Sequence, residues 1–555
     1  MKDKRYVIGL DFGTLSGRAV LVDTRDGAIV ATAVREYRHG IIQEGLPDSD
    51  VRLGVDWCLQ DPDDYLEVLQ AVVPALLGEG EVRPEQVIGL SLDFTASTLV
   101  PLTVDGTPLC KLPQYRNRPH AYVKLWKHHA AQPEADEINR KLSTFPNDVA
   151  AYYGDRISAE LPLPKAMQMM REDPELYRAM DTLSEAADWL NRLMTGARKR
   201  SINTAGYKAM YFNELGYPSE AFFRQIDPQL AGFVSEKLAG DICRMTERFG
   251  NLNAEWASRL GLCEGTAVGC SIIDAHAGMA GCGITQPGRM MLALGTSSVQ
   301  SMLSDTPYSS NGVIGTIRDS VIPGYYMWES GLAAVGDQLA WYAGLGAPPG
   351  EEGNAMQALS SRAENLAPGE CGLLALDWWN GNKTPYVNGR LSGVLLGLRL
   401  DTSTVEIFRA LMESTAFGTK MILDVFEQAG ESVREIVACG GIVEKNPLLM
   451  QIYADVLGRE IRVAGCSQTM ALGSAIYAAV AAGAKAGGYD TLDEAAKNMT
   501  CLKAESYRPN MRNHAIYQSL YREYRRLTGY FGGENANALH CLQTLRETAK
   551  QKKLT

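Results

Sequence analysis

Three segments of the chain share one pattern, in which a turn of small polar residues separates two apolar runs. The turns are Asp11-Phe12-Gly13-Thr14 within residues 7–22, Asp93–Thr98 within residues 87–104, and Gly295-Thr296-Ser297 within residues 290–303. Short apolar runs bounded by turn residues are typical of β-strands. We therefore expect each segment to form a hairpin with a polar tip.

Helical patterns lie between the hairpins. Asp61 before Pro62 predicts an N-cap and a helix over residues 62–77, and Ser184 predicts the start of another over residues 184–194. The remaining expected helices cover residues 404–428, 446–457, 471–483 and 515–527. The alanine-rich run at 471–483 is interrupted by glycine and then by Lys485, so we expect a buried core helix and no membrane span.

Strands that alternate with helices indicate an α/β protein. The first polar turn carries Gly-Thr-x-Ser and the third Gly-Thr-Ser, one near the start of the chain and the other near its middle. This placement favours two domains of related topology that face one cleft. A chain of 555 residues, of which 46% are hydrophobic, has room for at least two large cores.

Charge and cysteine content narrow the possible functions. A formal net charge of −11 argues against a nucleic-acid partner, and we expect the basic cluster Arg198-Lys199-Arg200 to cap the C-terminus of a helix. The 11 cysteines are scattered without a C-x-x-C pair, which fits a reducing cytoplasm and argues against disulfides or a zinc site. The first residues pass into a strand without the apolar region of a signal peptide. We expect a cytoplasmic protein with no membrane partner.

Several residues in the turns have chemistry that suits a nucleotide or a metal ion. Asp11 offers a carboxylate that can lie near a hydrated metal, and the neighbouring glycine lets backbone N–H groups approach an anion. Gly440 and Gly441 follow an apolar strand and precede Asn446, so a flat ligand could lie against the backbone at a helix N-terminus. A plain strand-to-helix turn has the same pattern, and both interpretations stay open.

Two acids are candidates for contact with a substrate. Asp274 lies between an apolar strand and a helix of small residues, where a carboxylate is either a general base or a helix N-cap. Glu329 follows an aromatic, apolar run and is either a buried polar contact or a ligand contact. Lys208 and Trp126 also have two interpretations each. Either residue could contact a ligand, but a lysine can also snorkel to the surface and a tryptophan can pack in the core.

Taken together, these residues resemble the motifs of the FGGY family of carbohydrate kinases, within the actin, hexokinase and Hsp70 group of ATPases. The resemblance runs nearly end to end. The turns at 11–14 and 295–297 are similar to the two phosphate loops of that group, and Gly440-Gly441 with Asn446 is similar to its adenosine motif. Two further segments are similar to short signatures of the family. They are Leu163-Pro164-Lys165 and residues 392–398, the latter followed by Glu406 and Glu413.

The resemblance implies two domains of ribonuclease H-like topology around a central cleft. Residues 1–284 would hold the sugar site, the first phosphate hairpin and the catalytic acid. Residues 285–555 would hold the second phosphate loop and the adenosine motif. The partners it implies are a ketopentose, ATP and Mg²⁺, with a homodimer as the assembly.

Within the family, the chain most resembles the members that phosphorylate ribulose. The segments concerned are 93–98, 125–127, 205–208, 212–214, 376–381 and 384–385. This implies ATP-dependent transfer of phosphate to the terminal hydroxyl of L-ribulose, giving L-ribulose 5-phosphate and ADP in L-arabinose breakdown. The alternatives are a kinase of D-ribulose, xylulose or a polyol, and a non-catalytic nucleotide-binding regulator. His128 stands where such members often have aspartate, which bears on sugar preference.

The resemblance also implies a role for each matched residue. Asp274 would be the general base, and Asp11 would organise Mg²⁺ through water. The residues expected to contact the sugar are Ala96, Trp126, Lys208, Asp274 and Glu329. Those expected to bind ATP are Thr14, Arg18, Gly295, Thr296, Gly440, Gly441 and Asn446.

Overall fold

The computed structural model describes residues 4–147, 149–154, 156–347, 350–533 and 536–554. Its first sheet is built around the N-terminal hairpin, in the strand order β11-β12-β5-β1-β2-β3. The strands are β1 (Tyr6–Phe12), β2 (Ser16–Asp23), β3 (Ile29–Glu36), β5 (Val87–Phe94), β11 (Arg248–Asn251) and β12 (Ala267–Gly269). Strands β1, β2 and β3 form an antiparallel meander, while β5 runs parallel to both β1 and β12.

The second sheet repeats this arrangement. Its corresponding strands are β18 (Tyr326–Leu332), β15 (Ser298–Ser304), β14 (Arg289–Leu294), β21 (Glu435–Cys439) and β22 (Ile461–Ala464). They lie in the order β18-β15-β14-β21-β22, with an antiparallel meander followed by two parallel pairings. The two sheets therefore share strand order and direction. The α/β class and the two-part architecture are confirmed, as are the hairpins at 7–22 and 290–303.

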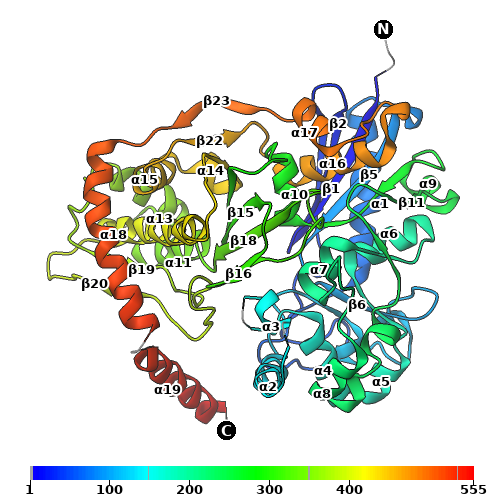
Figure 1. Cartoon of the computed structure of the whole chain (residues 1–555), viewed down its shortest axis with the longest axis horizontal. Helices are drawn as coiled ribbons and strands as arrows, with labels where there is room; N and C mark the ends of the chain where they lie inside the picture. Colours follow the sequence, from blue (N-terminus) through cyan, green and yellow to red (C-terminus); the bar gives the residue numbers. More distant parts are fainter. Residues whose placement is uncertain (1–3, 148, 155, 348–349, 534–535, 555) are drawn as a thin grey trace.

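Two helices join the sheets. Helix α10 (Asp274–Gly281) and helix α16 (Thr469–Ala482) pack against each other, and α16 also packs on β1 and β5 of the first sheet. A Cβ on Gly473 would lie 1.9 Å from the Ala277 carbonyl oxygen, so only glycine allows this approach. Helix α16 is buried along almost its whole length, as the sequence predicts. Figure 1 shows α16 and α17 (Leu492–Met499), in orange, beside the blue strands of the first sheet.

The segment 87–104 does not form the expected hairpin. Strand β5 belongs to the first sheet, whereas β6 (Leu99–Leu102) pairs with β7 (Val123–Lys124) and β8 (Thr182–Glu185) in a separate sheet. Both edges of β5 are already occupied, by β1 on one side and by β12 and β13 (Ile272–Ile273) on the other. The chain after β5 therefore has to leave the first sheet.

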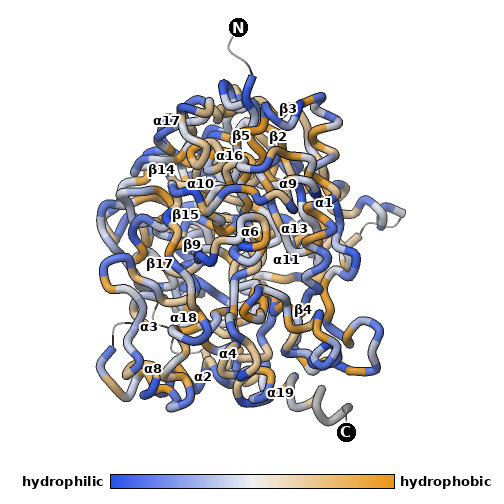
Figure 2. The backbone as a smooth tube through the Cα atoms, turned by 90° about the vertical axis from the view of Figure 1, so that its right-hand side faces the viewer, coloured by the Kyte–Doolittle hydropathy of each residue, from blue (hydrophilic) through white to orange (hydrophobic). Residues whose placement is uncertain are grey.

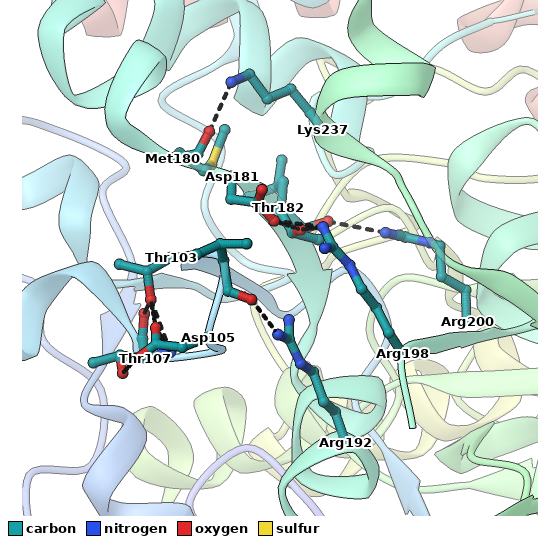
Figure 3. A network of polar contacts seen from close by, with 12 residues as sticks. Thr103, Asp105, Thr107, Met180, Asp181, Thr182, Arg192, Arg198, Arg200 and Lys237 are labelled. Carbon is teal, nitrogen blue, oxygen red and sulfur yellow. Dashed lines mark hydrogen bonds and ion pairs between the residues drawn. The ribbon is translucent and has the colours of Figure 1, made fainter. Parts of the chain in front are cut away.

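The basic cluster at 198–200 does not cap a helix. Lys199 and Arg200 lie in the short strand β9 (Lys199–Ser201), and Figure 3 shows the neighbouring basic side chains pointing at the ends of β6 and β8. Arg200 donates to the Leu183 carbonyl at 3.1 Å, and Arg198 binds Asp181 and Thr182. Arg200 gives a buried carbonyl of β8 a partner, and Arg198 pairs with the Asp181 carboxylate just before this strand.

The expected helices form, with changes at their ends. They are α1 (Pro62–Glu79), α6 (Ala186–Thr195), α13 (Thr404–Gln428), α15 (Pro447–Leu457) and α18 (Met511–Gly532). Asp61 accepts a hydrogen bond from the Asp63 N–H, as an N-cap should. Ser184 is not a cap, because it pairs with Val100 inside β8.

The hydrophobic interior accounts for the patterns of the strands. The buried apolar side chains of β1 and β2 alternate between two core clusters, with Ile8, Leu10 and Leu21 in one and Val7, Val20 and Val22 in the other. Both faces of this sheet, in the upper part of the view in Figure 2, are therefore covered. No helix in the described ranges is long and apolar enough to cross a membrane. All 11 cysteines are free thiols.

The glycine contact between α10 and α16 gives a stability prediction. Replacing Gly473 with alanine should destabilise the fold by about 1–3 kcal/mol, because the added methyl group has to push the two helices apart. Gly344, in the exposed part of α11 (Gly336–Gly346), serves as the control, because a Cβ added there would have no neighbouring atom within 4 Å. Gly344→Ala should stabilise by about 0.5–1 kcal/mol through helix propensity. Urea unfolding of both variants checks this; equal shifts would contradict the packing argument.

Candidate active site

Three carboxylates meet where parallel strands of the first sheet end. The register places Asp11 of β1 beside Asp93 of β5, and Asp93 beside Ile272 of β13. Asp274 follows β13 directly and begins α10. In open α/β sheets, ligands bind outside the carboxyl ends of the strands. The strand register therefore brings Asp11 and Asp274 into one site and adds Asp93, which the sequence did not single out.

Burial and neighbouring charges shift the pKa values of these acids. Asp93 is fully buried, and burial together with the Asp11 carboxylate raises its pKa well above the ordinary value. Ser474 of α16 donates to Asp93 Oδ2 at 2.6 Å, while Oδ1 has no partner among the described residues. Burial also raises the pKa of Asp11, against the opposing effect of Arg18, whose Nε lies 3.5 Å from Asp11 Oδ2.

Asp274 has the chemistry expected of a base. Burial, and then the Asp11 carboxylate, raise the pKa of Asp274 to about 7, although Lys208 acts in the opposite direction. The N-cap of α10 is Ile273, so helix capping does not explain the acid. One carboxyl oxygen accepts the Ala275 N–H at 2.7 Å. A carboxylate with this pKa can accept a proton near neutral pH.

Lys208 and Glu329 lie close to this base. Lys208 is on α7 (Ile202–Ala209) and Glu329 is on β18 of the second sheet. Burial alone would lower the pKa of Lys208, but Glu160, Glu329 and other carboxylates outweigh it and raise that pKa. Burial alone would raise the pKa of Glu329, but His276 and the nearby lysines lower it. The two side chains are therefore opposite charges in one cluster, contributed by both sheets.

Trp126 and Ala96 are placed beside the first polar turn. Trp126 Nε1 donates to the Thr14 hydroxyl at 3.2 Å. Ala96 lies in the turn after β5, which is tied to β1 by a hydrogen bond from the Thr95 N–H to the Phe12 carbonyl. The structure thus places these two expected sugar contacts beside the first turn.

Lys165, on α4 (Pro162–Glu172), has a place in the site that the sequence pattern does not reveal, although it lies in one of the family signatures. Its fully buried ammonium donates to the carbonyls of Ser97 and Leu125, both at 2.9 Å. Burial lowers the pKa of Lys165 to about 7. This lysine connects the turn that carries Ala96 to the loop that carries Trp126.

The second polar turn and the glycine pair also lie together. A Cβ on Gly440, where φ is 101°, would lie 2.3 Å from the carbonyl oxygen of Leu294, the residue before Gly295. Gly441 opens the short helix α14 (Gly441–Lys445) and faces open space. The Thr296 carbonyl accepts the Val335 N–H at 2.8 Å, which fixes the turn against the start of α11.

Asn446 is engaged in the fold itself. Its side-chain oxygen accepts the Leu449 N–H at 3.0 Å and caps α15, and its amide donates to the Ser360 hydroxyl at 3.2 Å. No hydrogen bond within the described ranges joins the first turn, at Gly13 and Thr14, to the second, at Gly295 and Thr296. The two turns are separate parts of the site.

Comparison with known proteins identifies the family. The C-terminal domain of the FGGY family of carbohydrate kinases matches residues 290–482, and the N-terminal domain matches residues 6–281. The chain belongs to the FGGY family of carbohydrate kinases. Its relatives include proteins named ribulokinase from Shouchella clausii, 46% identical over 99% of both chains, and from Mycolicibacterium smegmatis, 41% identical over 99% and 98%.

Solved structures support the same fold. The xylulose kinase of Rhodospirillum rubrum superposes with a TM-score of 0.76 at 24% identity and covers 95% of this chain and 99% of its own. A Plasmodium falciparum glycerol kinase with ADP gives a TM-score of 0.75 at 17% identity, over 95% and 98%. The FGGY membership and the shared fold make the protein a carbohydrate kinase with two lobes.

The contacts of Lys165 give a prediction for the two loops. In Lys165→Met the carbonyls of Ser97 and Leu125 lose a buried charged donor, which is worth about 1.5–3 kcal/mol. Hydrogen exchange of the amides in 94–99 and 123–128 should then accelerate by about tenfold or more. Lys503→Met, which removes an exposed ion pair with Glu444, is the control and should leave these peptides unchanged. Equal protection in both variants would contradict the linking role.

Proposed function

We propose that this protein transfers the terminal phosphate of ATP to the terminal hydroxyl of L-ribulose, giving L-ribulose 5-phosphate and ADP. The observation that carries the proposal is Asp274, a buried acid with a pKa of about 7 that is within the electrostatic influence of Asp11, Lys208 and Glu329. The choice of ribulose within the family rests on the relatives named ribulokinase, which match nearly the whole chain.

Asp274 is the proposed general base. It takes the proton of the attacking hydroxyl, and the oxygen then bonds to the phosphorus as the bond to the ADP leaving group breaks. Lys208 donates to sugar oxygens, and Glu329 accepts from sugar hydroxyls. Polar side chains of this kind discriminate strongly, because a sugar that lacks the matching hydroxyl leaves them unpaired. Ala96 and Trp126 contact the same sugar from the first lobe.

The phosphate-binding parts supply position and charge. Thr14 and Arg18 of the first turn, with Gly295 and Thr296 of the second, are proposed to hold the phosphates. Phosphoryl transfer depends mainly on such positioning and on neutralisation of negative charge. Gly440 and Gly441 are proposed to hold the adenine nucleotide, since Gly441 faces open space. Asn446 would contribute there mainly by fixing the start of α15.

The residues present fit a magnesium ion. Asp11 is a partly exposed carboxylate, and the buried Asp93 behind it has an oxygen with no partner in the described structure. No set of three His, Cys, Asp or Glu side chains in the described ranges could bind a metal unaided. Mg²⁺ keeps several of its waters and binds few protein carboxylates, so Asp11 would hold it through water. Bound Mg²⁺ supplies charge neutralisation at the phosphates. A cytoplasmic location and a homodimer remain predictions.

A substrate panel tests the sugar assignment. ADP release should be fastest, in terms of kcat/KM, with L-ribulose, and slower with D-ribulose, D-xylulose and glycerol. The physical reason is that a sugar of the wrong configuration leaves the charged groups of Lys208 and Glu329 without hydrogen-bond partners. Activity on D-xylulose or glycerol without activity on ribulose would overturn the assignment but leave the kinase chemistry in place.

A substitution and a pH profile test the base. Asp274→Asn should lower kcat by about 10²–10⁴-fold and leave the Kd for ATP nearly unchanged. In the unsubstituted enzyme, kcat/KM should fall as the pH drops through about 7, because protonated Asp274 cannot accept a proton. Asp455→Asn is the matched control, since Asp455 is a buried acid outside the site that accepts hydrogen bonds from Gln451, Asn510 and Asn513. Turnover that survives in Asp274→Asn would place the base elsewhere.

A further inference from the structure

The side chain of His276 lies between the sugar cluster and a buried amide. It is on α10, two residues after Asp274, and is almost completely buried. Its Nε2 lies 2.6 Å from Glu329 Oε2, and its Nδ1 lies 2.9 Å from the side-chain nitrogen of Asn203. The ring of Tyr207 packs edge-on against the imidazole, with 4.5 Å between the two ring centroids. One histidine therefore bridges α7, α10 and β18.

The orientation of the Asn203 amide is fixed by two backbone groups. Its oxygen accepts the Ile273 N–H at 2.9 Å, and its nitrogen donates to the Ser320 carbonyl at 2.8 Å. Turning the amide over would set oxygen against a carbonyl and nitrogen against an N–H. The nitrogen of Asn203 must therefore face His276 Nδ1, which can only accept.

This determines the protonation of the imidazole. Because Nδ1 accepts, the ring proton is on Nε2 and points at the Glu329 carboxylate. A doubly protonated ring would direct a second N–H at the Asn203 amide nitrogen, which has no lone pair to offer. His276 is thus a neutral donor, and the hydrogen bond orients Glu329 and favours its ionised form.

We propose that Asn203 and His276 are a positioning pair that holds Glu329 ionised and oriented to accept a hydroxyl of the sugar. Neither residue is proposed to touch the reacting atoms, and both act on the sugar through Glu329. The role assigned to Glu329 rests on the proposed function above. The pair would set sugar affinity without affecting the nucleotide, which binds to other parts of the site.

Substitution of His276 tests the pair by its effect on the two substrates. His276→Leu should lower kcat/KM for the sugar by about 10–100-fold through loss of one hydrogen bond to a charged group, with the KM for ATP unchanged. His276→Gln retains an N–H donor and should recover much of the loss. His120→Leu is the control, because His120 is a buried histidine whose Nε2 also lies 3.0 Å from a glutamate, Glu172, and whose ring packs on Trp57. It should leave the sugar KM unchanged.

The pH profile separates positioning from a general effect on folding. The groups that face Glu329 are His276 and Asp274 of α10, Lys208 and Tyr207 of α7, and Lys383 from the second lobe. Without the donor, the pKa of Glu329 rises, so His276→Leu should lose additional sugar affinity as the pH is lowered toward 5. His276→Gln should show less of this loss.

Nuclear magnetic resonance of ¹⁵N-labelled histidine tests the tautomer directly in the folded wild-type protein. The expected spectrum has a protonated Nε2 and an unprotonated Nδ1 for His276 at neutral pH, assigned by its absence in His276→Gln. A ring protonated at Nδ1, equal effects of His276→Leu on both substrates, or a glutamine variant no better than leucine would each overturn the proposal. If the enzyme prefers another sugar, the proposed function fails, and the same comparison with that sugar still decides the positioning role.

Discussion

The register of three neighbouring parallel strands is the constraint on which the site depends. It places Asp11 next to Asp93 and brings Asp274 to the same edge of the sheet. Burial raises the pKa values of all three acids, and the Asp11 carboxylate raises those of Asp93 and Asp274 further. Burial and repulsion of these acids disfavour folding, but they also give Asp274 the proton affinity that a base needs near neutral pH.

The helices that join the sheets also contribute residues to this edge of the first sheet. Helix α10 begins with Asp274, and α16 contributes Ser474, whose hydroxyl binds Asp93. The same two helices approach each other so closely that Gly473 admits no side chain. Helix α10 also carries His276, which binds Glu329 of the second sheet. One short helix therefore holds both the base and a contact with the second sheet. The architecture and the site therefore share their central contacts.

Sequence patterns were sufficient where structure is local. The hairpins at 7–22 and 290–303 and the helix at 404–428 formed as expected, because their strands and turns are determined by adjacent residues. The pattern at 87–104 predicts a hairpin just as clearly, but this prediction is wrong. The strands that pair with β5 are far away in the chain. Ser184 looked like a helix cap and is a strand residue for the same reason.

The residues of the site show the same difference between local and distant contacts. The residues of each motif could be named from the sequence, whereas Asp93, Lys165 and His276 act through partners far away in the chain. Lys165 binds carbonyls 68 and 40 residues distant, and no local pattern reports such contacts. The fixed amide of Asn203 is a further case, since its orientation follows from Ile273 and Ser320 together.

The central claim is that burial, together with the neighbouring Asp11 carboxylate, makes Asp274 a base, and the pKa of its own carboxyl group is the most direct test. It can be measured by ¹³C nuclear magnetic resonance of labelled aspartate, with the resonance assigned by its loss in Asp274→Asn. The expected pKa is about 7 in the unsubstituted protein and lower in Asp11→Asn, where the nearest like charge is gone. An ordinary aspartate pKa in both proteins would contradict the claim.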